Sequence, residues 1–378
     1  MTKQLWGRVF VDGAVRDSML VTIGGEQIVD VAHEARAPEG AHVVHGVVSP
    51  GFIDVHVHGG DGADFMDGSD EAAARVATFH ATQGTTTLAA TTLSGSREDL
   101  QRAVSAIARV SREHLRGAEI CGVHLEGPYI NRERAGAQDA ASIRAASIDE
   151  VAALHALAPH LRWIITIAPE CDGARAVIEH FRDRILFSIG HTSADFGDAV
   201  AALGWGAAHF THLFNAMTGM HHREPGTVGA ALNSRDATAE LIADGIHVHP
   251  AVLRVATQAM PDRIALITDA VRACGMPDGK YKLYEHEFTV ADGAARLPGG
   301  TLAGSVLTMI RAVQNMVELA GLPIECVLPL ASQVPARILG VADRKGKIER
   351  GYDADLVVIS EKFAVERVLV RGEDVPLP

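Results

Sequence analysis

The sequence predicts an α/β fold: a (β/α)8 barrel of the TIM type, with a small β-sandwich domain formed from both chain termini. Three observations support this prediction. Between residues 47 and 339, apolar segments alternate with Ala-rich helical segments, as in parallel sheets buried by helices. Both ends of the chain consist of short β-type segments. Residues that suit metal binding follow strands spread around the whole barrel region.

The small domain is predicted from residues 1–46 and 340–378. The first part contains β-type segments separated by Asp-Gly, Gly-Gly and Pro-Glu-Gly turns, namely Leu5–Val11, Met19–Ile23, Gln27–Val31 and His42–His45. Near the C-terminus the same pattern returns in Gly346–Ile359 and Arg367–Val370. A single sandwich that combines both ends is the simplest arrangement, and it leaves residues 47–339 for the barrel.

Eight apolar segments of the barrel region are predicted as its strands. They are Val47–Val55, Thr85–Thr92, Glu119–Leu125, Arg162–Ala168, Ile185–Ile189, Ala207–Thr211, Glu240–Ala243 and Ile264–Thr268. Helical segments follow most of them: Asp70–Gln83, Arg97–Arg116, Ile148–Ala158, Ala194–Leu203 and His249–Met260, with a last helix at Ile324–Leu339. Eight such units over roughly 250 residues match the usual size of this barrel.

An open, doubly wound sheet is the alternative architecture. In such a sheet the ligand site lies at one switch point, on a few adjacent strands. In this sequence, candidate ligands end strands throughout the barrel region, which favours the closed form. The catalytic groups of a closed barrel lie at the carboxyl ends of its strands.

The composition excludes several classes of function. Of the 378 residues, 47% are hydrophobic and 21% are charged, which is typical of a globular protein. The net charge of −13 argues against non-specific binding to nucleic acid. No apolar segment approaches the ~20 residues of a membrane-spanning helix, and the first residues lack the apolar core of a signal peptide. The four cysteines form no CxxC pair. We therefore expect a cytoplasmic protein without nucleic-acid or membrane partners.

The segment Asp54–Gly60 is the most informative one. It ends an apolar strand and contains His56 and His58, whose side chains point to the same side of an extended chain. Neutral imidazole is a common ligand of zinc and iron, so the two histidines can bind one metal ion. For this segment alone, two hydrogen-bonded histidines without a metal are an equally good explanation.

Later strands also end in metal-ligand residues. Glu126 follows an apolar strand, where a carboxylate is costly unless a cation or a metal accompanies it. His191 and His212 end two further strands. An arginine could neutralise Glu126, and either histidine alone would be structural, but the whole set favours a carboxylate–imidazole metal centre. His124 and His209 lie further back in their strands, where packing in the core is the better interpretation.

Two more residues follow the last predicted strands. Asp269 ends strand Ile264–Thr268 and is the natural general base, because activation of water requires a proton acceptor near the metal. Ligation of a metal is the alternative role of Asp269. His247 follows strand Glu240–Ala243 at the same rim, whereas His249 precedes a proline and is expected to begin a helix.

The loop Thr218–Gly226 contains Arg223. A guanidinium forms paired hydrogen bonds with phosphate or carboxylate oxygens better than any other side chain. A loop arginine that only contacts solvent is the simpler alternative, and the neighbouring pair His221-His222 is expected at the surface.

With these residues assembled, the chain resembles the amidohydrolase superfamily and, within it, the N-acetylglucosamine-6-phosphate deacetylase family. The motifs that carry the resemblance span most of the chain: Pro50–Gly59, His124–Pro128, Gly190–Thr192, Thr211–Met217, Arg223–Gly226, Ala243–His247, Thr268–Ala270 and Leu302–Ser305. The segments HLEGP and THLFNAM are specific to this family, whereas the His-x-His pair and the terminal Asp are shared by the superfamily.

The resemblance implies a divalent metal cofactor with one or two ions per subunit. Glu126, His191 and His212 would hold the main metal, and His56 and His58 a second one that Glu126 bridges. Zinc is the first choice, with iron, manganese and cobalt as alternatives, since all accept nitrogen and oxygen ligands.

The resemblance also implies roles for residues of the later motifs. Asp269 corresponds to the aspartate that transfers protons. The substrate contacts would come from Asn215, Ala216, His247, Ala137 and Leu302, and from Gln138, which replaces a histidine of some members. Arg223 corresponds to an arginine that binds the phosphate across the interface of a homodimer.

The function implied is hydrolysis of N-acetyl-D-glucosamine 6-phosphate, in amino-sugar metabolism, to D-glucosamine 6-phosphate and acetate. One alternative is the same chemistry on N-acetylgalactosamine 6-phosphate or another N-acyl substrate. A more distant alternative is a non-catalytic regulator that binds a sugar phosphate. Segment Thr166–Glu170 lacks the lysine that carries the carbamate bridge of dihydroorotase- or urease-like members, which disfavours those activities.

Overall fold

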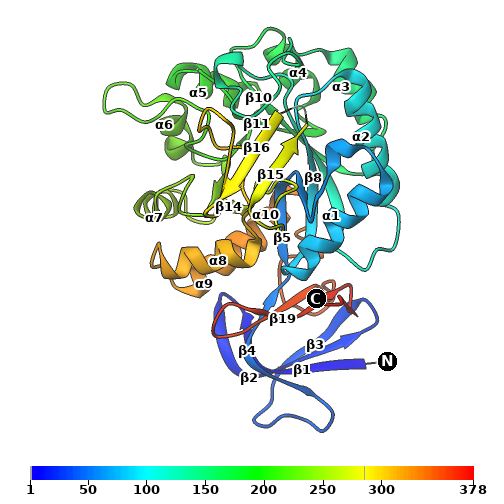
Figure 1. Cartoon of the computed structure of the whole chain (residues 1–378). Coiled ribbons are helices and arrows are strands. Elements are labelled where there is room, and N and C mark those ends of the chain that lie inside the picture. The colour runs from blue at the N-terminus through cyan, green and yellow to red at the C-terminus, as the bar shows by residue number, and fades with distance from the viewer. Residues whose placement is uncertain (1, 285) are drawn as a thin grey trace.

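The computed structural model describes residues 2–284 and 286–378. Within these residues, eight parallel strands form one sheet in the order β14-β13-β12-β11-β10-β9-β8-β5 (Figure 1). They are β5 (Phe52–Val57), β8 (Thr85–Thr92), β9 (Glu119–Glu126), β10 (Arg162–Ile167), β11 (Ile185–Ile189), β12 (His209–Phe210), β13 (Thr238–Ile242) and β14 (Ile264–Ile267). The predicted parallel sheet is therefore confirmed.

Hydrogen bonds join the two edge strands of this sheet and close it into a barrel. The backbone N–H of Asp269, just after β14, donates to the carbonyl of His56 in β5 over 2.9 Å. Thr268 Oγ1 donates to Asp54 Oδ2 over 2.5 Å between the same two segments. The closed barrel is thus correct, and the open sheet is not.

Helices cover the outside of the barrel. They are α1 (Asp70–Thr82), α2 (Arg97–Val110), α3 (Ile148–His155), α4 (Ala174–Phe181), α5 (Phe196–Trp205), α6 (Gly226–Asn233), α7 (Pro250–Ala259), α8 (Met309–Glu318), α9 (Ile324–Ala331) and α10 (Gln333–Ile338), with short 3-10 helices at Phe65–Asp67 and Arg132–Arg134. The sequence did not predict α4, α6 and α8. No helix in the described ranges is long and apolar enough to span a lipid bilayer.

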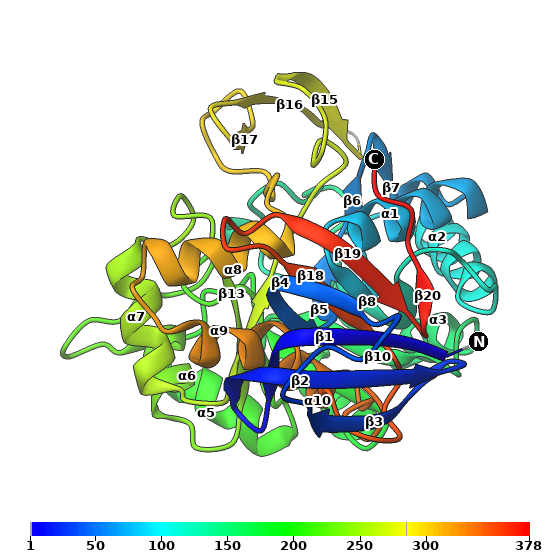
Figure 2. The same cartoon turned by 90° about the horizontal axis from the view of Figure 1, so that it is seen from below.

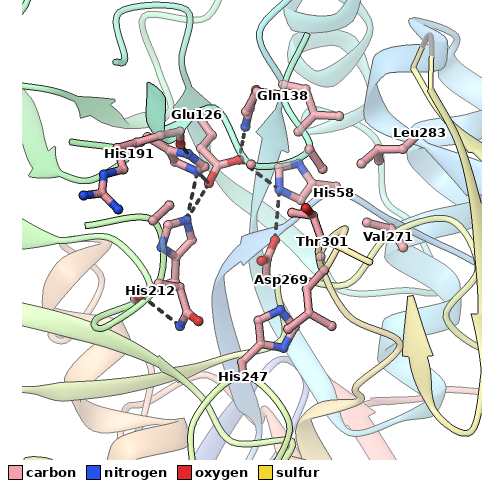
Figure 3. Close-up of a pocket in the computed structure, with 18 of the residues that line it drawn as sticks. His58, Glu126, Gln138, His191, His212, His247, Asp269, Val271, Leu283 and Thr301 are labelled. Atoms are coloured by element: carbon pink, nitrogen blue, oxygen red, sulfur yellow. Dashed lines mark hydrogen bonds and ion pairs between the residues drawn. The ribbon is translucent and has the colours of Figure 1, made fainter. Parts of the chain in front are cut away.

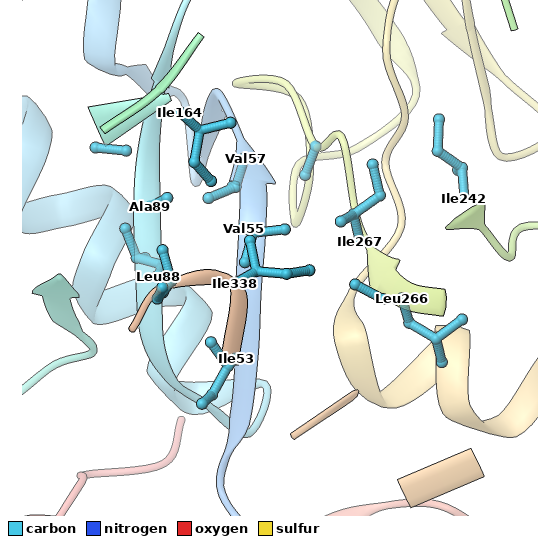
Figure 4. Packing of buried hydrophobic residues seen from close by; sticks show 14 of the residues in the cluster. Ile53, Val55, Val57, Leu88, Ala89, Ile164, Ile242, Leu266, Ile267 and Ile338 are labelled. Atoms are coloured by element: carbon cyan, nitrogen blue, oxygen red, sulfur yellow. The ribbon is translucent and has the colours of Figure 1, made fainter. Parts of the chain in front are cut away.

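Side chains alternate along β5 between the helices and the barrel interior. Val55 belongs to the main hydrophobic core and lies beside Ile338 of α10 (Figure 4). Because successive side chains of a strand point to opposite sides, His56 and His58 face the interior. This alternation directs both histidines towards the barrel axis.

Strands from both chain termini form a second sheet below the barrel in Figure 1, and this sheet faces the viewer in Figure 2. In the described part of the chain it has seven strands in the order β20-β19-β18-β4-β1-β2-β3. They are β1 (Thr2–Val11), β2 (Ala14–Gly24), β3 (Gln27–His33), β4 (His42–Pro50), β18 (Leu356–Ile359), β19 (Val365–Val370) and β20 (Glu373–Asp374). Val47 and Val357 belong to the barrel core, whereas Val48 and Val358 belong to a separate core, so the sheet buries both faces.

The predicted strand Val47–Val55 is wrong, because the chain changes sheets at Gly51. Residues 47–50 pair with β18 in the small sheet, and the barrel strand starts at Phe52. A Cβ on Gly51 would lie 2.2 Å from Thr86 Oγ1, so only glycine permits this close approach. The small sheet thus extends four residues past the predicted boundary at residue 46. Whether the two sheets belong to separate domains stays a prediction.

Three further differences from the prediction concern segments outside the barrel strands. Residues after β14 form a separate sheet of β15 (Gly279–Leu283), β16 (His286–Ala291) and β17 (Ala294–Arg296), which projects from the barrel in Figure 2. A short hairpin, β6 (Gly59–Gly60) with β7 (Ala63–Asp64), follows β5. The predicted helix Ile324–Leu339 is two helices. In one continuous helix, the ring of Pro335 would clash with the backbone carbonyl of Ala331, four residues earlier.

An ion-pair cluster joins the start of β9 to the loop before β18. Glu119 Oε1 lies 2.7 Å from Arg344 Nη2, and Glu119 Oε2 lies 2.8 Å from Lys345 Nζ. The Lys345 side chain is buried, and its Nζ lies 2.5 Å from Asp355 Oδ2. Burial disfavours the charged form of Glu119, but Arg344 and Lys345 lower its pKa to about 2.

We expect Glu119→Gln to lower the free energy of unfolding by about 3 kcal/mol at neutral pH. A carboxylate with a lowered pKa stabilises the fold above its ordinary pKa of 4.5, and this contribution is lost as the pH falls towards about 2. Wild type should therefore lose stability over this range more steeply than the variant. Urea unfolding at a series of pH values tests this, with exposed Glu361→Gln as the control. Equal stability of Glu119→Gln and wild type at pH 7 would contradict the prediction.

Candidate metal centre and active site

A cavity of about 430 Å³ opens at the carboxyl ends of the barrel strands (Figure 3). Most of the residues singled out in the sequence line it: His58, Glu126, Ala137, Gln138, His191, His212, Asn215, Ala216, His247, Asp269 and Leu302. His56 is fully buried, with its Nε2 3.2 Å from His58 Nε2. The topology therefore gathers residues from distant parts of the chain at one end of the barrel.

Glu126, His191 and His212 direct three ligand atoms to one point. Glu126 Oε1 lies 3.1 Å from His191 Nε2 and 3.0 Å from His212 Nε2, and the two nitrogens lie 3.1 Å apart. All three side chains are buried. One carboxylate oxygen and two imidazole nitrogens in this arrangement match the ligand types of zinc and related metals.

Hydrogen bonds outside the cluster show that these atoms fit a metal ion. His191 Nδ1 lies 2.7 Å from the carbonyl oxygen of Arg134, which can only accept, so Nδ1 carries the proton. In neutral His191 the lone pair of Nε2 then faces the carboxylate of Glu126. Two groups with lone pairs directed at each other repel unless a proton or a metal cation lies between them. The donor set therefore fits a divalent metal.

A second group of ligand atoms adjoins the first. His56 Nε2 and His58 Nε2 lie 3.2 Å apart. The first is 3.4 Å from Glu126 Oε1, and the second is 3.4 Å from Glu126 Oε2. The carboxylate of Glu126 thus lies between both histidine pairs, as a bridging ligand of two metals would.

The electrostatic field of the carboxylates in the cavity favours cations. Burial disfavours a protonated His58, but the carboxylates of Asp269 and Glu126 raise its pKa to about 9. Although burial also disfavours a charged Glu126, the surrounding histidines hold the pKa of this carboxyl well below its ordinary range. The carboxylates that favour a proton on His58 equally favour a metal cation in its place.

Asp269 lies opposite Glu126, across His56 of β5 and His58, which follows β5. Its Oδ1 is 3.1 Å from His58 Nε2 and 3.6 Å from His56 Nε2. Burial raises the pKa of Asp269, but the two histidines lower it by more, so the net pKa lies below its ordinary value. The carboxylate is therefore ionised at neutral pH and can accept a proton.

Three of these residues have left-handed backbone conformations. The φ angles are 46° for His191, 27° for His212 and 50° for Asp269. Residues other than glycine rarely adopt such angles, which cost on the order of 1–3 kcal/mol each and occur preferentially at functional sites. The turns after β11, β12 and β14 thus use strained backbone to direct these side chains into the cavity.

The opposite wall carries polar groups that suit a sugar. His247 lines the cavity (Figure 3). Its Nδ1 lies 2.6 Å from Asp244 Oδ2, and this contact orients the ring. Burial disfavours a charged Asp244, but His247 holds its pKa below the ordinary value. Asn215 and the backbone at Ala216 complete this wall.

Gln138 lies on the other side of Glu126. Its Nε2 donates to Glu126 Oε2 over 2.5 Å, and its Oε1 accepts from the backbone N–H of Ser94 over 2.6 Å. Both ends of the amide therefore have protein partners. The predicted contact of Gln138 with a substrate stays a prediction.

Three other residues lie outside the cavity. Arg223 is exposed, with its Nη1 2.8 Å from His222 Nε2 in the loop before α6. His124 and His209 are buried and hydrogen-bonded: the first to the carbonyl of Val55 and to Thr166, the second as described below. This agrees with the expected structural role of the two histidines.

Comparison with known proteins identifies the family. The sequence profile of the amidohydrolase family matches residues 47–375. The chain belongs to the amidohydrolase family. As an amidohydrolase it is a hydrolytic enzyme, and the family assignment agrees with the barrel and with a cavity lined by metal-ligand residues.

Two curated relatives of this amidohydrolase, and one solved structure similar to it, have more specific names than the family. It is 38% identical over 324 residues to N-acetylglucosamine-6-phosphate deacetylase of Vibrio furnissii, covering 85% of this chain and 81% of the relative. It is also 38% identical over 328 residues to N-acetylgalactosamine-6-phosphate deacetylase of Escherichia coli O157:H7, covering 86% and 87%. A mutant of the Mycobacterium smegmatis N-acetyl-D-glucosamine-6-phosphate deacetylase, in complex with N-acetyl-D-glucosamine-6-phosphate, superposes with a TM-score of 0.94 at 35% identity over 99% of both chains.

Several residues of the amidohydrolase site were not foreseen. Glu240 of β13 is fully buried next to the candidate ligands, and Arg134 and Leu283 line the cavity. A charged residue inside the apolar segment Thr238–Ile242 was a usable signal for Glu240, because such a carboxylate needs buried partners. Nothing in the local sequence distinguishes Arg134 or Leu283 from ordinary loop residues.

Proposed function

We propose that this amidohydrolase hydrolyses N-acetyl-D-glucosamine 6-phosphate to D-glucosamine 6-phosphate and acetate. The observation that carries the proposal is the carboxylate–imidazole cluster around Glu126 with the ionised Asp269 opposite it. The polar wall around His247 gives the sugar a place beside this cluster. The deacetylase relatives at 36–38% identity support the same substrate class.

Glu126, His191 and His212 would hold the main metal ion, and His56 with His58 a second one, bridged by Glu126. Zinc is the first choice, and iron, manganese or cobalt would fit the same ligands. The chemistry that such a metal would supply there is polarisation of the acetamide carbonyl and a lower pKa of a water molecule.

Asp269 would act as the proton carrier of the reaction. As water attacks the carbonyl carbon of the acetamide, the carboxylate accepts one proton from that water. It then returns the proton to the amide nitrogen as the carbon–nitrogen bond breaks, so that glucosamine 6-phosphate leaves as an amine. The acetic acid that remains keeps the other proton of the water and releases it to solvent as acetate. Asp269 is ionised and can therefore accept the proton in the first transfer, and the poor amine leaving group requires the second.

The remaining residues would bind the sugar. His247, Asn215 and Ala216 would contact its polar groups, and Ala137 and Leu302 would line the opposite side. Binding energy from these remote groups holds the acetamide beside the catalytic cluster.

Arg223 would bind the 6-phosphate from the neighbouring subunit of a cytoplasmic homodimer. Its exposed loop places the guanidinium outside its own cavity, and a two-fold interface would place it in the cavity of the partner. Each active site would then be completed by the other chain.

Arg223→Ala should raise KM for the phosphorylated sugar by roughly 10- to 100-fold, because a hydrogen bond to a charged group contributes ~1.5–3 kcal/mol. Turnover of the unphosphorylated sugar should change little. Steady-state kinetics on both substrates measure the difference. An equal loss on both sugars would mean that Arg223 does not bind the phosphate.

Mixing Arg223→Ala chains with Asp269→Asn chains tests the interface. If subunits exchange, each mixed dimer contains one site with both defects and one site with neither, so part of the activity should return. No recovery despite exchange, verified by mass spectrometry of tagged chains, would place Arg223 outside the partner's site.

Acetate release from purified, metal-loaded protein tests the proposed function. We expect turnover of N-acetylglucosamine 6-phosphate to exceed that of N-acetylgalactosamine 6-phosphate. The opposite order would favour the alternative that the Escherichia coli relative represents. Binding of either sugar phosphate without acetate release would instead indicate a regulator.

A further inference from the structure

We propose that Glu240 is a positioning residue that orients His56 and His212 as metal ligands. This inference rests on the proposed metal centre, and it adds a residue that contacts neither metal nor substrate. Glu240 lies in β13, between Ala239 and Leu241, and is fully buried.

Both oxygens of Glu240 are hydrogen-bonded. Oε2 accepts from His56 Nδ1 and from the backbone N–H of His212, each over 2.9 Å. Oε1 lies 3.1 Å from His209 Nε2. His209 Nδ1 in turn lies 2.6 Å from Thr238 Oγ1, which fixes the ring. Burial opposes ionisation of Glu240, but His56 and His209 hold its pKa well below the ordinary value.

The first contact selects the tautomer of His56. A carboxylate accepts but does not donate, so His56 Nδ1 carries the proton. The neutral ring then directs the lone pair of Nε2 towards His58 and Glu126, where a metal ion would bind. Without Glu240, nothing at Nδ1 would favour this tautomer over the one with a proton on Nε2.

The second contact holds the turn that carries His212. The carbonyl of Glu240 also accepts from the backbone N–H of Leu213 over 2.9 Å. One residue of β13 thus binds two successive N–H groups after β12. The φ angle of His212 is 27°, a strained value that persists only where neighbouring bonds enforce it. Glu240 therefore connects one ligand of each candidate metal.

Position 240 would not require a charge for packing alone. An apolar side chain on this buried strand would pack without any cost of desolvation, whereas a buried carboxylate must be compensated by several donors. Partners of this kind behind metal-bound histidines typically change metal affinity by 10–100-fold when they are removed.

The test compares metal binding of Glu240→Ala and Glu240→Gln in the full chain. Zn²⁺ content is measured after dialysis, and Zn²⁺ affinity by competition with a chelator. Glu240→Ala should bind Zn²⁺ 10–100-fold more weakly than wild type. The Zn²⁺ affinity of Glu240→Gln should stay within a few-fold of wild type. The amide oxygen of the glutamine can accept from both N–H groups, and its NH2 group can donate to His209 Nε2 once His209 moves its proton to Nδ1.

Two controls separate positioning from general destabilisation. Thr238→Val removes the outer contact of His209, together with a long hydrogen bond to the carbonyl of Ala208, and should keep the Zn²⁺ affinity of wild type. Glu119→Gln weakens the fold at the opposite end of β9 and should also keep it. Wild-type Zn²⁺ affinity in Glu240→Ala, or equal losses in Glu240→Ala and Glu119→Gln, would overturn the proposal.

Nitrogen-15 NMR of histidine-labelled, metal-free protein tests the tautomer of His56 even if Glu240→Ala does not fold, because no bound metal then dictates which nitrogen carries the proton. His56 should carry its proton on Nδ1 in wild type and in Glu240→Gln, with its signals identified by their loss in His56→Asn. An unprotonated Nδ1 in wild type would overturn the proposal. Neither readout requires turnover of a sugar, so a different substrate would leave the inference intact.

Discussion

Asp269→Asn should lower kcat by roughly 10²- to 10⁴-fold while leaving the metal content close to that of wild type. The amide has nearly the same shape as the carboxylate but accepts a proton poorly, so both proposed proton transfers would fail. Asparagine also tolerates the left-handed backbone of this position, where φ is 50°. The fold should therefore survive the substitution.

The measurement combines acetate-release kinetics with metal analysis of the same preparation. Asp292→Asn is the matched control, because Asp292 is exposed in the turn between β16 and β17 and has a φ of 51°. It should retain full activity. Activity of Asp269→Asn within a few-fold of wild type would remove this aspartate from the mechanism.

His191→Asn and Glu126→Gln should each lose the main metal and the activity together. Each substitution removes a ligand atom from the cluster in which all three atoms lie about 3 Å apart. Metal content per subunit and kcat should fall in proportion to each other. Full metal content in His191→Asn would contradict the proposed main site.

The double variant His56→Asn/His58→Asn separates the two metals. It should lose only the second ion, since Glu126, His191 and His212 remain in place. Partial activity in this variant would mean that one metal suffices for the reaction. Loss of both ions would mean that the two sites form one unit, as the shared carboxylate of Glu126 would allow.

The barrel strands could be predicted because a buried parallel strand is apolar on both faces. Thr85–Thr92 and Ile185–Ile189 have the predicted bounds, and the other strands differ at their ends. The predicted strand Val47–Val55 was wrong because Gly51 and its neighbours are as apolar as a strand. Only the contact with Thr86 reveals the change of sheet. The β15–β17 sheet was missed because its strands are short and partly exposed, although Phe288 and Val290 of β16 alternate with exposed residues.

The site could be predicted as far as the ends of the strands determine it. Glu126, His191, His212 and Asp269 each follow an apolar segment, and a closed barrel necessarily gathers such ends. The partners of these residues could not be predicted, because they come from distant segments. The amide of Gln138 contacts Glu126, and Glu240 contacts His56, only once the barrel has closed.

The small sheet affects the order in which the chain can fold during synthesis. β4 leaves the ribosome early, but its neighbour β18 starts at Leu356, near the end of the chain. At roughly 5–20 residues per second, synthesis of the intervening barrel takes tens of seconds. During this time one edge of β4 has no partner, although the barrel strands that follow it can already pair. Every chain that stops before β18 would keep this edge exposed, and an unpaired strand edge can bind other chains. Completion of the small sheet thus requires that synthesis has passed β18.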